Sequence, residues 1–470
     1  MLFLAIVSLG ATIGLTIWHW QLGIMPLLLE LYKVINSVRY IARRLPAPAL
    51  RTVSVRAHVW LTGLQLLIGA LWVLGHAMGF GVYLWPTVAV AQLLGGLMLL
   101  RVTLHTWRHA VPFAAAEPLT DKELPTLSVL IPARNETDDL KQCLASLVAS
   151  DYPKLEIIVL DDNSTNRRTP DIIKSFAHSG VRFVQGDPVD EVNWLAKNQA
   201  YARLRLEASG ELLLFCGVDV RVEPETLRQL VQLLLARDKD MVSVLPMRDE
   251  VSRVRASLLQ PMRYYWELCL PRRVFKRPPV LSTCWLIRTV ALDRAGGFDA
   301  ERRSITPEAY FARQAVVTDS YSFIRSTAAL GLRSTKPAHA QYDTSVRMRY
   351  PQLHRRLELI ALTTLAELLF LLGPVVGLLL SWLAGPKTMV YAALWFATTV
   401  CLWVTYYIVA VSTRLNGPFV GWLLMPVAFM TDIYIQHASL LKYEFGHVVW
   451  KGRDTTVPVM GRPQLSSRSS

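Results

Sequence analysis

The fold is decided by three stretches of the sequence: LSVLIPARNE at residues 127–136, EIIVLDDNS at 156–164 and LLLFCGVDV at 212–220. Each begins with a short apolar run and ends in polar residues. Continuous apolar runs bounded by Pro, Asp, Gly or Asn are typical of buried parallel strands. With a fourth run further along, the sequence predicts strands at Leu127–Ile131, Ile157–Leu160, Val181–Val184 and Leu212–Phe215.

Helix-like segments separate these strands. Apolar residues recur at helical spacing in residues 140–148, directly after the capping residues Thr137 and Asp138. The same spacing appears in residues 227–235, after Pro224. Strands that alternate with helices predict an α/β domain with a mostly parallel sheet and helices on both faces. In such sheets, ligands bind beyond the carboxyl ends of the strands.

Apolar segments flank this domain. The 470 residues are 52% hydrophobic and only 18% charged, a balance that suits a protein partly dissolved in lipid. Residues 57–100 carry no charge and offer room for two membrane crossings with a break near Gly79–Gly81. Further segments cover residues 2–29, 359–386, 388–413 and 418–441. We therefore expect transmembrane helices on both sides of the α/β domain.

The distribution of charge suggests an orientation. The net charge is +14, and Glu30 is the only acidic residue before Glu117. Between the first and second apolar segments lies a predicted basic loop with Lys33, Arg39, Arg43, Arg44, Arg51 and Arg56. Positive loops stay in the cytoplasm, so the α/β domain is predicted to be cytoplasmic. The positive charge is assigned to membrane and phosphorylated substrate, with no nucleic-acid partner.

The expected domains are a transmembrane region of about three spans (1–110), a cytoplasmic domain (117–356), a second membrane region (357–445) and a cytoplasmic tail (446–470). Within the second region, the segment 418–441 is either a third span or a re-entrant helix. Pro426 and Asp432 favour the broken form. The five cysteines have no metal-like or paired spacing and are interpreted as buried small hydrophobic residues.

The polar ends of the strands are the candidate site. Asp161 and Asp162 follow the second strand, and Asp219 follows the fourth. An isolated Asp-Asp-Asn-Ser is usually a turn. Three polar endings in succession instead favour carboxylates that bind a base, a ribose, or a divalent cation bridging two phosphates.

Residues 127–227 resemble the family 2 glycosyltransferases, with LSVLIPARNE and EIIVLDDNS as the family's first two signatures. The ceramide glucosyltransferase-like branch is the nearest, because segments 193–198, 216–227, 310–313 and 450–453 are similar to segments of that branch. The resemblance spans roughly residues 125–455. It implies a GT-A-like domain that binds a nucleotide diphosphate sugar.

The resemblance also assigns roles to residues. Uridine would be held by Pro132, Glu136, Asp161 and Asp162. Lys197 would approach the diphosphate, and Asp219 would lie beside a Mg²⁺ or Mn²⁺ ion. Arg347-Met348-Arg349-Tyr350 is the best counterpart of the family's Gln-x-x-Arg-Trp motif, so Arg347 would bind the donor and Arg349 would assist the leaving group.

The sequence departs from the family at two important positions. Gly217 replaces the first carboxylate of the Asp-x-Asp metal motif. The family's base lies in a Glu-Asp pair after Gly-Gly-Phe, where this chain reads Thr306-Pro307-Glu308-Ala309. Either Glu308 has taken over as base, or the base is lost at Ala309. We favour Glu308.

These features predict an inverting hexosyltransferase that acts on a membrane lipid, whose nucleophile is either a hydroxyl or a phosphate. Two alternatives remain. One is a catalytically silent membrane protein that binds nucleotide sugar, suggested by Gly217, Ala309 and Tyr350 at motif positions. The other is a polysaccharide synthase or extruder, for which the apolar segments lack an obvious polar conduit.

Overall fold

The computed structural model describes residues 8–10, 12–13, 20–42, 47–79, 81–111, 119–190, 193–248, 254–270, 277–384, 389–414 and 423–456. The chain forms two compact units. The helical unit comprises Met1–Leu100, Tyr342–Val404 and Leu423–Val448. The sheet unit comprises Arg101–Gln341, Thr405–Trp422 and Val449–Ser470.

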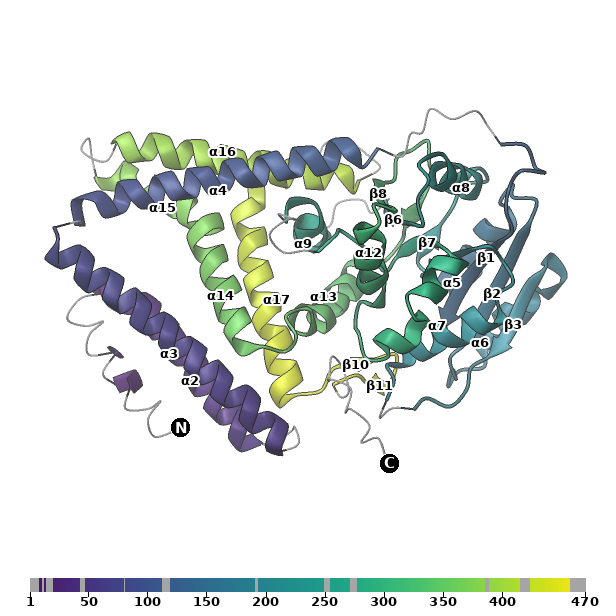
Figure 1. Ribbon diagram of the computed structural model, residues 1–470, viewed down its shortest axis with the longest axis horizontal. Coiled ribbons are helices and arrows are strands. Elements are labelled where there is room, and N and C mark those ends of the chain that lie inside the picture. Colours follow the sequence, from purple (N-terminus) through teal and green to yellow (C-terminus); the bar gives the residue numbers. More distant parts are fainter. Residues whose placement is uncertain are drawn as a thin grey trace. The chain divides into compact units, whose positions relative to one another are not determined.

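The sheet unit is built on a seven-stranded sheet with the order β3-β2-β1-β4-β7-β6-β8 (Figure 1). β7 runs antiparallel to both of its neighbours, and the other pairs are parallel, which confirms the predicted mostly parallel sheet. The four predicted strands are confirmed to within two residues at each end. The strands are β1 (Leu127–Ala133), β2 (Leu155–Asp161), β3 (Val181–Gln185), β4 (Leu212–Cys216), β6 (Met241–Leu245), β7 (Cys284–Arg288) and β8 (Tyr321–Arg325).

Helices cover both faces of this sheet. Alternate residues of a strand point to opposite faces, so Val129 and Ile131 join one hydrophobic core while Leu130 joins the other. The first core includes α5, α6 and α8, and the second includes α7, α11 and α12. The helices of this unit are α5 (Asp138–Val148), α6 (Arg168–Ser175), α7 (Ala196–Glu207), α8 (Thr226–Ala236), α9 (Val254–Cys269), α11 (Thr289–Arg294) and α12 (Pro307–Val317), with 3₁₀ turns η1 (Ala177–Ser179) and η2 (Gly297–Glu301).

Two short ribbons complete the sheet unit. β5 (Val220–Arg221) pairs antiparallel with β9 (Arg333–Ser334), directly after β4. β10 (Val449–Trp450) pairs antiparallel with β11 (Arg453–Asp454) and forms a hairpin near the end of the chain. All five cysteines are free and buried, as predicted.

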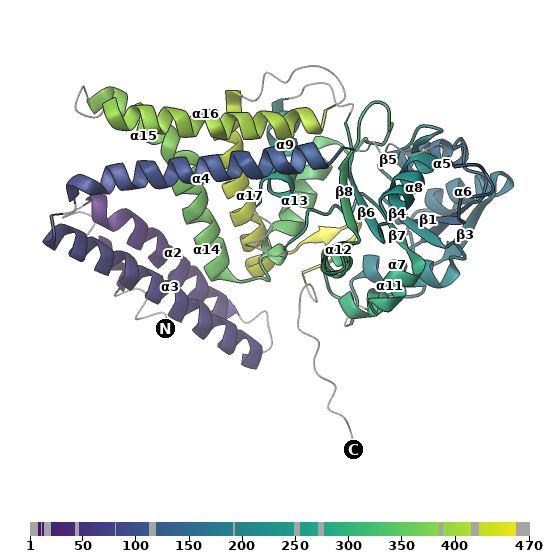
Figure 2. The same cartoon turned by 45° about the horizontal axis from the view of Figure 1, so that its top comes forward.

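The helical unit is made of long helices (Figures 1 and 2). Gly96 lets α4 approach α16 closely, because a Cβ at this glycine would lie 3.1 Å from Thr398 Cγ2. A π-helical turn, Leu368–Leu372, joins α14 to α15. The helices are α2 (Trp20–Ala42), α3 (Ala47–Ala77), α4 (Gly81–His109), α13 (Ala338–Gln352), α14 (Leu357–Glu367), α15 (Gly373–Ala384), α16 (Met389–Ser412) and α17 (Met425–Phe445), of which α4, α13 and α16 continue into the sheet unit.

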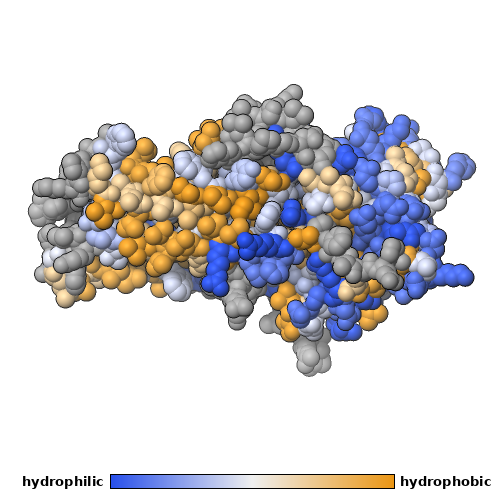
Figure 3. Space-filling model, turned by 90° about the horizontal axis from the view of Figure 1, so that it is seen from above, coloured by the Kyte–Doolittle hydropathy of each residue, from blue (hydrophilic) through white to orange (hydrophobic). Residues whose placement is uncertain are grey.

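Within the described residues, three helices are long and apolar enough to cross a membrane: Trp85–His109, Leu357–Trp382 and Met389–Ser412. Their surfaces carry exposed apolar side chains such as Leu94, Leu379, Trp382 and Phe396. Figure 3 shows the corresponding hydrophobic colour over this part of the chain. Exposed apolar surface of this extent marks contact with lipid or with another protein.

The predicted basic loop is wrong as a loop. α2 continues through it to Ala42, and Lys33 and Arg39 are only 4% and 2% exposed. Lys33 pairs with Glu30 at 2.8 Å, and Arg39 donates to Tyr350 Oη at 3.1 Å. Glu444 Oε2 also lies 3.8 Å from Arg39 Nε, so carboxylates neutralise two charges that we expected to face water. Arg43 and Arg44 lie outside the described residues, as do residues 2–7, 117–118, 385–386, 418–422 and 457–470 of the predicted segments and domains.

Candidate active site

The candidate site lies where β1 and β4 separate. β1 pairs with β2 along its whole length, but it pairs with β4 only as far as Leu130. Pro132 lies beyond this point, where its missing N–H interrupts no pairing with β4. From β1 the sheet extends through β2 and β3 on one side and through β4 on the other. This reversal of strand order is a topological switch point, the usual ligand site of open α/β sheets.

The loops after β1 and β2 are tied together. Asn135 and Asn163 have positive φ angles of 49° and 52°, a conformation that Asn tolerates better than most residues. The backbone N–H of Asn135 donates to Ser164 Oγ at 2.9 Å, and that of Thr165 donates to Asn135 Oδ1 at 2.8 Å. The two loops therefore form one connected edge of the site.

Asp161 serves the local turn. Its Oδ1 accepts hydrogen bonds from the backbone N–H of Ser164 at 3.2 Å and from Ser164 Oγ at 2.5 Å. An Asp that accepts from the backbone three residues further along stabilises its own turn. The role predicted for Asp161 at the donor therefore has to be compatible with this structural bond.

Glu136 and Asp162 are paired with the C-terminal hairpin. Glu136 Oε2 lies 3.0 Å from Lys451 Nζ, and Asp162 Oδ2 lies 2.5 Å from Arg453 Nη1. Burial raises the pKa of both carboxyl groups, even though the two cations act in the opposite direction. Two predicted donor-binding residues therefore lie side by side with positive charges from the far end of the chain.

Asp219 is held by the β5–β9 ribbon. Ser334 Oγ donates to Asp219 Oδ2 at 2.8 Å. Burial alone would raise the pKa of Asp219, but the charge of Lys336 and the bond from Ser334 lower it overall, so this carboxylate is ionised at neutral pH.

Gly217 accommodates the Asp219 side chain. A Cβ at position 217 would lie only 2.6 Å from Asp219 Oδ1. Among the described residues, no three His, Cys, Asp or Glu side chains are grouped to hold a metal. Mg²⁺ is often bound by one or two carboxylates together with substrate phosphates and water, so Asp219 fits such an ion only in the presence of the donor.

Glu308 occupies the first turn of α12. Its side chain is 1% exposed, and within the described part of the chain its Oε2 has no hydrogen-bond partner. Burial raises the pKa of Glu308, with Lys197 acting in the opposite direction. The neighbouring Ala309 is 4% exposed and packs into the second hydrophobic core, so a carboxylate there would face apolar side chains.

Tyr201 links the predicted residues electrostatically. Lys197 Nζ lies 5.0 Å from the centre of the Tyr201 ring. Burial raises the pKa of Tyr201, and the charges of Glu308 and Asp219 raise it further. The charge of Asp219 also contributes to the raised pKa of Glu136. Tyr201 is therefore in contact with Lys197 and within electrostatic reach of Glu308 and Asp219.

Arg347 and Arg349 lie on α13 in the helical unit. Arg349 forms an ion pair with Asp432 of α17. Tyr350 is fully buried, and its Oη accepts from Arg39 and donates to the carbonyl of Arg355 at 2.9 Å. Its ring therefore has no open face for a sugar.

Sequence reasoning missed the role of Asn198. Its Nδ2 donates to the carbonyls of Glu301, Arg302 and Ser304 at 2.7, 3.2 and 2.8 Å, in the loop that leads to the helix of Glu308. Asn198 shares the buried side of α7 with Tyr201 and Leu204. An amide on the apolar face of a helix is the signal that could have pointed to this role.

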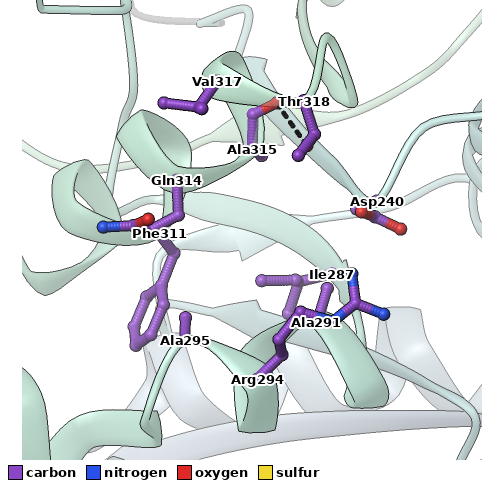
Figure 4. A pocket seen from close by; sticks show the side chains of 10 residues that line it. All are labelled: Asp240, Ile287, Ala291, Arg294, Ala295, Phe311, Gln314, Ala315, Val317 and Thr318. Carbon is purple, nitrogen blue, oxygen red and sulfur yellow. Dashed lines mark hydrogen bonds between the residues drawn. The ribbon is translucent and has the colours of Figure 1, made fainter.

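A small pocket of about 150 Å³ lies elsewhere in the sheet unit, lined by residues of α11 and α12 (Figure 4). Its walls are mostly apolar, and Arg294 and Asp240 stand at its rim. None of the predicted donor, metal or catalytic residues lines it.

Comparison with known proteins finds similarity to glycosyltransferases. Residues 128–296 match the family model described as glycosyl transferase family 2. The chain is 28% identical over 204 residues to a probable glycosyltransferase, YdaM, from Bacillus subtilis, with 40% of this chain and 47% of the relative covered. It is 39% identical over 74 residues to an N-acetylglucosaminyltransferase from Rhizobium meliloti, with 15% and 17% covered. The chain thus spans less than half the length of these curated relatives.

Two solved structures are similar to the chain at low identity. One is the mannosyltransferase PcManGT from Pyrobaculum calidifontis in complex with GDP-Man and Mn²⁺, with 16% identity, a TM-score of 0.43, and 76% of this chain and 98% of that chain covered. The other is S. aureus TarS 1–349 in complex with UDP-GlcNAc, with 16% identity, a TM-score of 0.34, and 68% and 92% covered.

Proposed function

We propose that this chain, whose residues 128–296 match the glycosyl transferase family 2 model, transfers a hexose from a UDP-linked donor to a membrane lipid with inversion at the anomeric carbon. The observation that carries the proposal is Glu308. A buried carboxylate oxygen without a partner is costly, and a raised pKa makes it a stronger base. Both features suit a group that receives a proton from an acceptor hydroxyl.

The reaction is a single displacement. The acceptor oxygen forms a bond to the anomeric carbon as the bond from that carbon to the diphosphate oxygen breaks. The electron pair leaves with the nucleoside diphosphate, and Glu308 Oε2 takes the hydroxyl proton. The Lys197 ammonium lies near the Tyr201 ring, and its charge lowers the pKa of Glu308. We propose that it contributes positive charge on the donor side of the site.

A divalent ion held by Asp219 and the donor phosphates would offset charge on the leaving diphosphate. Pro132, Glu136, Asp161 and Asp162 form the proposed nucleoside side of the site. Arg347 and Arg349 remain proposed diphosphate contacts. Arg349→Ala tests that role, because a leaving-group contact predicts a lower kcat with little change in lipid KM.

The acceptor is proposed to be a lipid because the same chain carries three helices able to span a membrane. A lipid whose acceptor group is a hydroxyl must lose a proton to a base, a role that Glu308 can fill. Such an acceptor also agrees with the resemblance to the ceramide glucosyltransferase-like branch. We place the sheet unit in the cytoplasm, where nucleotide sugars are available.

The experiment incubates detergent-purified protein with UDP-hexoses or GDP-mannose, Mg²⁺ or Mn²⁺, and a total lipid extract, and follows glycolipid by mass spectrometry. We expect one hexosyl adduct, and its loss by about 10²-fold or more in Asp219→Asn and Glu308→Gln. Asp293→Asn is the matched control, because Asp293 is an exposed carboxylate that pairs with Arg205 at 2.6 Å.

Each contrary outcome has a distinct meaning. Donor binding without any product would support the catalytically silent alternative, which Gly217 favours. Products with many sugars would support a polysaccharide synthase. Full activity of Glu308→Gln would remove Glu308 as base and favour a lipid phosphate, which is already an anion and needs none.

A further inference from the structure

The C-terminal hairpin, residues 449–454, has an unusual turn. Val449 pairs with Asp454 and Trp450 with Arg453, so Lys451 and Gly452 form a two-residue turn. Their φ angles are 50° and 81°. Positive φ at both positions defines the type I′ geometry, which favours Asn-Gly. Lys451 therefore adopts a conformation that lysine rarely takes, which points to a use for its side chain.

The hairpin docks on the loop after β1 through its backbone. Arg134 Nε donates to the carbonyl of Lys451 at 3.0 Å, and Arg134 Nη1 donates to the carbonyl of Asp162 at 2.7 Å. Asn135 Nδ2 donates to the same carbonyl of Lys451 at 3.5 Å. These bonds use neutral carbonyl acceptors. The bonds to the Lys451 carbonyl therefore hold the hairpin in part independently of the charges of its own side chains.

The charged heads of the hairpin face the candidate donor residues. Lys451 and Arg453 have side chains that are 34% and 14% exposed, and they pair with Glu136 and Asp162. Arg453 also donates to the carbonyl of Asp162 at 3.1 Å. With Arg134, this edge of the sheet unit gathers three cations beside carboxylates assigned to the nucleoside.

We infer that the hairpin is part of the donor site and that Lys451 and Arg453 bind the donor's diphosphate. The inference rests on the proposed function. A nucleoside diphosphate offers more negative charge and more acceptor oxygens than one carboxylate, and an Arg guanidinium can bind phosphate through two parallel hydrogen bonds. Glu136 and Asp162 hold the two heads in place until the donor arrives and then turn to the nucleoside.

The lone metal-site carboxylate supports this role. Gly217 leaves Asp219 as the single carboxylate at the metal position of the motif, so an ion there would be held weakly before the donor binds. Cationic side chains that bind the diphosphate would compensate for weak metal binding at such a site, because they offset the same negative charge. Lys451 and Arg453 are cations already fixed at the carboxyl edge of the sheet.

The test measures binding of UDP, GDP and uridine to the full chain in detergent by calorimetry. Lys451→Asn removes the ammonium while Asn suits the positive φ. Arg453→Gln removes the second cation. Arg205→Ala is the control, because Arg205 makes a similar two-bond pair with Asp293 at 3.0 and 2.6 Å. We expect UDP affinity to fall about tenfold for each hairpin variant, with uridine affinity and the control unchanged.

Unchanged or tighter UDP binding would overturn the inference, and so would an equal loss for UDP and uridine, which would indicate a purely structural hairpin. Melting temperatures accompany each measurement, and if Arg453→Gln fails to fold, Lys451→Asn alone decides. A wild-type protein that binds neither UDP nor GDP would refute the proposed function itself. Binding by the wild type with no effect of the hairpin variants would refute only the inference.

Discussion

Asn198 offers the most direct test of how the proposed base, Glu308, is positioned. Its side chain is fully buried, and its Nδ2 holds the three carbonyls of the loop 301–304 that leads into α12. Its Oδ1 accepts no bond within the described residues, so the donor group makes the whole contribution. We predict that Asn198→Ala loosens this loop and displaces Glu308.

The size of the effect follows from these contacts. Nδ2 carries two hydrogens, so its three contacts amount to about two full hydrogen bonds. A net contribution of about 1 kcal/mol per bond gives a loss near 2 kcal/mol for Asn198→Ala, reduced if water enters. One backbone bond, from Leu195 N–H to the Arg302 carbonyl at 2.9 Å, remains and keeps the loop near its place. Asn198→Asp is predicted to be worse, because it buries a carboxylate among carbonyl oxygens.

The assay combines denaturant unfolding in detergent with steady-state kinetics. Asn198→Ala is expected to lower kcat about 10²-fold with little change in donor KM, because a base misplaced by about 1 Å loses its alignment. Gln199→Ala is the control, since Gln199 on the same helix bonds to Pro188 and Asp190 instead. Wild-type kcat in Asn198→Ala, or an equal loss in Gln199→Ala, would refute the reasoning.

Three further predictions follow from single contacts. Burial raises the pKa of Glu308 above its ordinary value of 4.5, so the stability of the wild type falls as the pH rises from 4.5 through the folded pKa. Melting curves should show the difference in stability between Glu308→Gln and the wild type growing in favour of the variant across this pH window. A difference that does not change with pH would contradict the assignment. Gly217→Ala should fold but lose about tenfold or more in metal-dependent activity, because its Cβ displaces the Asp219 carboxylate; unchanged activity would contradict this. Asp432→Asn should lower the free energy of unfolding by about 3 kcal/mol, because it removes the carboxylate that pairs with Arg349, and adding Arg349→Gln should restore most of this loss. A double variant no more stable than Asp432→Asn alone would argue against the pairing.

The first half of the sheet could be predicted from the sequence. β1, β2, β3 and β4 are apolar runs with polar ends, because parallel strands are buried on both faces. β7 was not predicted. It runs antiparallel between β4 and β6, and nothing in the run Cys284–Arg288 marks this reversal. Strand direction depends on where the chain returns, which is information that a local pattern lacks.

The charged residues were predicted less well, because their partners are distant. Arg39 reads as part of a basic loop, yet it is buried against Tyr350, 311 positions away. Arg453 reads as a tail residue, yet it pairs with Asp162 at a separation of 291 positions. Composition indicates how many charges a segment carries, and only the fold indicates which of them are neutralised.

The departures from the family motifs acquire a physical meaning in the structure. Because Gly217 has no Cβ, the Asp219 carboxylate can lie against its backbone, and Ala309 packs into the second hydrophobic core. Glu308, in contrast, keeps a buried carboxylate oxygen that has no partner among the described residues, a group that a methionine would avoid. A protein that only bound nucleotide sugar would gain stability by losing this group, so its presence favours catalysis over silent binding.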